Sequence, residues 1–114
     1  MLSIETLRRF GANTHDGLGR CMNNEAFYLR LVSMALDEAN FGRLEEAVNS
    51  GDKKAAFEAA HALKGVLGNL ALTPLYDVTS EMTELLREGE DADYAAMLAE
   101  ILRQREELVA ERDR

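Results

Sequence analysis

The residue with the clearest chemical potential in this chain is His61, which lies in a segment rich in alanine and leucine. From about residue 53 to residue 72 the apolar side chains recur with helical spacing. The resulting stripe, which should face the core, contains Ala56, Ala60, Leu63, Leu67 and Leu70. At about 100° per residue His61 points away from this stripe, toward solvent. A neutral imidazole nitrogen is a good nucleophile near pH 7, so His61 is a candidate acceptor of a phosphoryl group.

Three further residues share the helix face of His61. Lys64 follows at i+3, Gly65 at i+4 and Gly68 at i+7. Glycine inside a helix costs roughly 1 kcal/mol relative to alanine, and on a solvent face it gains nothing from packing. We therefore interpret the glycines as clearance that lets another protein approach the imidazole. Lys64 supplies a cation for the oxygens of a phosphoryl group.

Two apolar side chains, Phe57 and Leu72, are expected to flank this face and to contact the partner. Phosphoryl transfer generally needs a divalent cation and carboxylates, and none cluster beside His61 in the sequence. We therefore expect no cofactor on this chain and Mg²⁺ only on the partner. No metal site is expected either, because His15 and His61 are far apart and Cys21 is the only cysteine.

Simpler interpretations of the same residues exist. A lone histidine on a helix is most often an ordinary surface residue, and a single lysine is most often solvated charge. The two glycines could instead permit close helix–helix packing, but that interpretation needs them on the buried stripe of the helix. For His15, beside Asp16 and Gly17, a solvated loop position is the better interpretation.

Length and composition restrict the class of protein. The chain has 114 residues, of which 46% are hydrophobic, as expected for a single globular domain spanning residues 1–114. Its 21 acidic and 13 basic residues give a net charge of −8, which disfavours nucleic-acid binding. No apolar stretch approaches the roughly 18 residues of a membrane span, and no signal peptide is visible. The single cysteine suits a reducing compartment, so we expect a cytoplasmic protein.

The rarity of proline and the abundance of alanine, leucine and glutamate predict an all-α fold. Four long amphipathic segments with short connections predict an antiparallel four-helix bundle with short accessory helices. The accessory helices are the first, after Ser3, and the third, opened by Asn40. Residues 12–23 are expected to form a loop, because they contain Asp16-Gly17 and Gly19. The four long helices are expected after the caps Asn24, Asp52 and Thr73 and after Asp91 or Asp93.

The segment His61-Ala62-Leu63-Lys64-Gly65, preceded by Ala59-Ala60, resembles the H-x-L-K-G motif of histidine-containing phosphotransfer (HPt) domains. The resemblance extends to the chain length, the order of helices, Asn69 eight residues after the histidine and Leu75 in the next helix.

The resemblance implies that His61 takes a phosphoryl group from the aspartyl phosphate of a response-regulator receiver domain and passes it to another receiver. It implies that Lys64 holds the phosphoryl group and that Gly65 gives clearance. The partners implied are receiver domains and a hybrid histidine kinase. Family members often have glycine ten residues after the histidine, where this chain has Ala71. They often place Gln or Glu on the next helix near the imidazole, and the gapless match here is Thr83. A basic residue one turn further matches Arg87, and we expect both Thr83 and Arg87 to contact the partner.

Two other functions remain open at this stage. A histidine-kinase dimerisation domain also presents histidine on a helical bundle, but it has an acidic residue after the histidine and a proline soon after. This chain has Ala62 and Val66 at those places, and no ATP-binding region follows. A helical adaptor that binds receiver domains without phosphorylation is the second alternative. We expect a monomeric carrier that is not an enzyme by itself.

Overall fold

The computed structural model describes all 114 residues and consists of seven α-helices without any strand. The helices are α1 (Ile4–Phe10), α2 (Thr14–Arg20), α3 (Glu25–Ala35), α4 (Ala39–Ser50), α5 (Lys53–Asn69), α6 (Thr73–Arg87) and α7 (Tyr94–Arg112). The prediction of an all-α fold is confirmed. None of the seven helices combines the length and the apolarity that crossing a bilayer requires.

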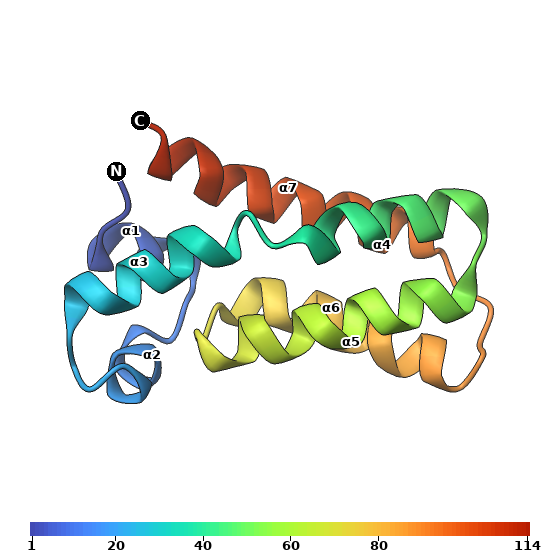
Figure 1. Ribbon diagram of the computed structural model, residues 1–114, viewed down its shortest axis with the longest axis horizontal. Coiled ribbons are helices and arrows are strands. Elements are labelled where there is room, and N and C mark those ends of the chain that lie inside the picture. Colours follow the sequence, from blue (N-terminus) through green and yellow to red (C-terminus); the bar gives the residue numbers. More distant parts are fainter.

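Helices α4 to α7 form the main body. α5 packs against α4 and α6, and α7 packs against α6 and α4, so that each of the four has two neighbours. Figure 1 shows that successive helices of this set run in alternating directions along the long axis of the molecule. The stripe predicted for α5 is buried along its whole length. The innermost side chains, from all four helices, are Leu44, Leu63, Leu67, Leu75, Met82, Ile101 and Leu108.

The predicted role of the third helix is wrong. The segment expected to be a short accessory helix is α4, which has 12 residues and packs against both α5 and α7. Its buried side chains Phe41, Leu44 and Ala47 form the stripe that makes this contact. α3, expected to be a bundle helix, instead precedes α4 beyond a short break (Figure 1) and packs against α2. The apolar stripes of α3 and α4 are alike in sequence, so periodicity alone did not distinguish them.

The prediction of a loop over residues 12–23 is also wrong, because this segment contains α2. The side chain of Asn13 caps the helix by accepting a hydrogen bond from the amide of Asp16 at 3.1 Å. Gly17 is buried rather than placed in a turn. A Cβ atom on Gly17 would lie 2.5 Å from ring atoms of Tyr28, so glycine permits α2 to approach α3 closely.

The caps explain where most of the other helices begin. Ser3, Asn24, Asp52 and Asp93 each accept a hydrogen bond from a backbone amide in the first turn, as predicted. α6 differs, because its N-cap is Leu72 and not Thr73. α5 ends at Asn69 rather than at about Leu72 as predicted, and residues 70–72 form a tight corner that turns the chain into α6. This corner lies beside the candidate site.

Candidate functional site

His61 lies on the exposed face of α5, as the helical periodicity predicted. Its ring stacks on that of Phe57, one turn earlier, with the centroids 5.6 Å apart and the planes 12° from parallel. The guanidinium carbon of Arg87, on α6, lies 5.1 Å from the centroid of the Phe57 ring. The stack covers one face of the imidazole and orients it. Because the His61 side chain is exposed, the ring remains accessible from solvent.

Lys64 is half-buried beside α6 and is already paired. Its Nζ atom lies 3.2 Å from Oε1 of Glu84, and the other carboxylate oxygen of Glu84 lies 3.3 Å from Nε of Arg87. The hydrogen bond from Lys64, together with the charge of Arg87, lowers the pKa of Glu84, which therefore stays ionised. Lys64 and Arg87 therefore both contact the carboxylate of Glu84, and Lys64 lies one helix turn from His61. Glu84 is not among the site residues that the sequence predicts.

The two glycines on this face have different environments. A Cβ atom on Gly65 would meet no atom within 4 Å, so this position is open, as expected for clearance. A Cβ atom on Gly68 would lie 3.0 and 3.2 Å from ring atoms of Tyr76 on α6. Gly68 therefore has a packing role that clearance for a partner does not account for. The absence of a side chain at Gly68 lets the Tyr76 ring of α6 pack against α5. For this position the structure supports close helix–helix packing.

Two residues predicted to contact a partner are fully buried, and both predictions are wrong. Leu72 is 0% exposed, because α5 ends at Asn69 and the helical periodicity used to place Leu72 does not extend beyond that residue. Thr83 is also 0% exposed, and its hydroxyl donates a 2.7 Å hydrogen bond to the carbonyl of Thr79. Thr83 therefore points into the core of the bundle and does not contact His61.

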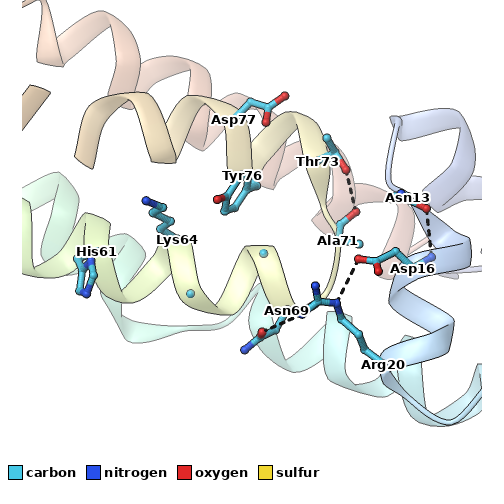
Figure 2. A pocket seen from close by; sticks show the side chains of 12 residues that line it. Asn13, Asp16, Arg20, His61, Lys64, Asn69, Ala71, Thr73, Tyr76 and Asp77 are labelled. Carbon is cyan, nitrogen blue, oxygen red and sulfur yellow. Dashed lines mark hydrogen bonds and ion pairs between the residues drawn. The ribbon is translucent and has the colours of Figure 1, made fainter. Parts of the chain in front are cut away.

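An open groove of about 570 Å³ runs from His61 along α5 toward the corner between α5 and α6 (Figure 2). Three helices contribute to its walls. The lining residues are Asn13, Asp16, Arg20, His61, Lys64, Gly65, Gly68, Asn69, Ala71, Thr73, Tyr76 and Asp77. The residues from α2 are not among the predicted site residues, because the sequence pattern predicts a loop over residues 12–23. The capping pattern of Asn13 followed by Asp16 was the signal that could have revealed this helix.

The groove contains no recognisable metal centre, since no cluster of three or more His, Cys, Asp or Glu side chains could hold an ion. His15 is exposed on α2 and does not line the groove. The groove brings together one exposed imidazole, that of His61, and the cations Lys64 and Arg20. Such an arrangement suits a group that carries negative charge and is delivered from outside.

The Hpt domain family model matches residues 30–111, which is most of the chain. The chain therefore belongs to the Hpt domain family, and membership implies a phosphotransfer carrier role in two-component or phosphorelay signalling. The match contains α4 to α7 and the segment from His61 to Gly65, whereas α1 and α2 lie outside it. A search of curated proteins and a search of solved structures each returned no match.

Proposed function

We propose that this protein carries phosphoryl groups between receiver domains and that His61 is its sole phosphorylation site. The observation that carries the proposal is the placement of an exposed imidazole on α5 beside the open position of Gly65 and the cation Lys64. Family membership supports the same role. The domain is a single one that spans residues 1–114.

The transfer step uses one nitrogen of His61 as the nucleophile. Its lone pair attacks the phosphorus of an aspartyl phosphate, the bond from phosphorus to the carboxyl oxygen breaks, and the aspartate leaves as a carboxylate. The other ring nitrogen carries the imidazole proton. Transfer to a second receiver reverses these bonds with a new aspartate as the acceptor. Mg²⁺ and the carboxylates that bind it belong to the receiver, and Lys64 neutralises charge on the phosphoryl oxygens.

Replacement of His61 by Gln tests the assignment, and His15→Gln is its matched control because His15 is the only other histidine. Each variant is mixed with a receiver domain labelled on its aspartate. We expect His61→Gln to take up no label and His15→Gln to take up as much as the wild type. Loss of the stack on Phe57 should cost no more than about 1 kcal/mol, so both variants stay folded. Full labelling of His61→Gln rules out the assignment.

Donation of the phosphoryl group by a partner, rather than by ATP, is the second part of the proposal. The sequence contains neither a P-loop nor the glycine-rich loop of a kinase. Incubation of the pure protein with labelled ATP and Mg²⁺ should leave it unlabelled. Stoichiometric labelling without a partner contradicts the carrier role.

The partners in this proposal are receiver domains, including that of a hybrid histidine kinase, and the protein acts as a monomer in the cytoplasm. We expect the protein to sediment at the mass of one chain, whereas kinase dimerisation domains form dimers, and sedimentation as a dimer would contradict this part of the proposal. If a receiver binds the protein but never labels it, the chain is a helical adaptor and not a carrier.

A further inference from the structure

The groove beside His61 has one wall that the family match does not cover. Two walls come from α5 and α6, whereas Asn13, Asp16 and Arg20 come from the segment around α2. Figure 2 shows Arg20 reaching from α2 to Asn69 at the end of α5, with Asp16 beside it. We propose that the Arg20–Asp16 pair is a second docking contact for the receiver domain, which helps to determine which receivers are accepted. This inference rests on the proposed function.

The wall formed by α2 packs against α3 and against the corner between α5 and α6. Gly17 lies against the Tyr28 ring, and the Tyr28 hydroxyl donates a 2.8 Å hydrogen bond to the carbonyl of Leu70 at the corner between α5 and α6. Burial raises the pKa of Tyr28 to about 12, so this hydroxyl remains a donor near neutral pH. The amide of Asn13 donates to the carbonyl of Ala71, 2.9 Å away. These contacts join α2 to the corner at the end of α5, the helix that carries His61.

Contacts within the chain orient the Arg20 side chain but leave some of its N–H donors free. Its Nε atom lies 3.1 Å from Oδ2 of Asp16, and its Nη1 atom lies 3.5 Å from Oδ1 of Asn69. A guanidinium has five N–H donors, so donors remain for a partner. The side chains of Arg20 and Asp16 are 53% and 46% exposed. Together they present a donor and an acceptor side by side, which favours discrimination between partners over raw affinity.

A receiver docked on His61 is large enough to reach this pair. Asn69 lies eight residues after His61 on the same helix, which is about 12 Å along the axis at about 1.5 Å per residue. A protein–protein interface of standard size covers about 800 Å² on each partner, which corresponds to a disc of about 16 Å radius. A receiver centred on His61 therefore covers the end of α5 where Arg20 lies. Arg20 is too far from the imidazole to take part in the chemistry.

The test is Arg20→Glu, with Arg9→Glu as a control that changes the net charge equally. Arg9 is exposed on α1 and faces Glu107 and Glu111 of α7, away from the groove. Two quantities are measured with a receiver that labels His61: the second-order rate constant of transfer and the rate at saturating receiver. Affinity for the unphosphorylated receiver is measured by titration. Thermal melts check that both variants are folded.

We expect Arg20→Glu to lower the second-order constant and the affinity about tenfold, and Arg20→Ala about two- to fivefold. The rate at saturation should stay within about twofold, because the contact affects docking and not the chemical step. The loss should shrink at high salt and differ among receivers. Arg9→Glu should change none of these quantities.

Equal losses in Arg20→Glu and Arg9→Glu would overturn the inference, since total charge would then explain them. So would an unchanged affinity in Arg20→Glu. If the wild type binds the receiver but accepts no label, the carrier function fails, and the affinities of the two variants still decide the role of Arg20.

Discussion

The two glycines near His61 should respond differently to the same substitution. Gly65→Ala places a methyl group in open space, so only helix propensity changes, and the free energy of unfolding should rise by roughly 0.5–1 kcal/mol. For a domain of this size that is a rise in Tm of about 3 °C. Gly68→Ala gains the same propensity but places its methyl group 3.0 Å from the Tyr76 ring. Overpacking of this kind costs about 1–3 kcal/mol, so the net change should lie between zero and a loss of about 2 kcal/mol.

A double-mutant cycle isolates the contact with Tyr76. In a Tyr76→Ala background the crowding is absent, so Gly68→Ala should now stabilise the protein by about as much as Gly65→Ala does in the wild type. Thermal and urea melts of the single and double variants give the coupling. If Gly68→Ala stabilises the wild type by the full amount and shows no coupling to Tyr76, the packing explanation for Gly68 is incorrect.

Transfer kinetics test the other half of the argument, the clearance at Gly65. Gly65→Gln keeps the helix but fills the open space one turn from His61, and should hold the aspartyl phosphate away from the imidazole. Because in-line transfer tolerates little misplacement, a shift of about 1 Å could slow transfer on the order of 100-fold. Gly65→Ala should slow it much less. Transfer by Gly65→Gln at the wild-type rate would show that no partner approaches over this position.

Three further substitutions test packing within the fold by thermal melts, and for the second of them transfer is measured as well. Gly17→Ala should destabilise by about 1–3 kcal/mol because its methyl group would meet the Tyr28 ring, whereas the control Gly19→Ala, which meets no atom within 4 Å, should not destabilise. Thr83→Val should change stability by less than about 1 kcal/mol and leave transfer within about twofold, because the hydroxyl contacts only its own helix; a large loss of transfer would return Thr83 to the site. Gln104→Met should stabilise by about 1 kcal/mol, because the buried Gln104 Oε1 has no hydrogen-bond partner; a loss of stability would show that this oxygen is satisfied.

The features predicted correctly from sequence are those determined within a few residues. Ser3, Asn24 and Asp52 were identified as caps because a cap acts on amides two or three residues ahead. The exposed position of His61 followed from the spacing of α5 alone. The failures arise where a distant neighbour decides the outcome. Gly17 looked like a turn residue, and only the Tyr28 ring explains why a glycine is needed inside a helix.

Residues on the second helix of the site could not be placed from the sequence, because the register between α5 and α6 depends on how the two helices pack. A gapless comparison selected Thr83, but α6 buries Thr83 and presents the next residue, Glu84, to Lys64. Arg87, one turn further on α6, lies with its guanidinium over the Phe57 ring, a contact that the sequence did not predict. An error of one residue in register rotates the side chain by about 100°, which is enough to exchange a core residue for a site residue.

The pairing of Lys64 with Glu84 determines how the site can use its charge. Taken from the sequence, Lys64 is a free cation, but in the structure it already neutralises a carboxylate. When Lys64 turns from Glu84 to a phosphoryl group on His61, that carboxylate still has a second partner. Arg87 is that partner, because its Nε atom lies 3.3 Å from the second oxygen of Glu84. The group formed by Lys64, Glu84 and Arg87 keeps a net positive charge, in a chain whose total charge is −8. The charge that a phosphoryl group would meet is therefore set by the residues around α5 and α6, and the net charge of the whole chain has the opposite sign.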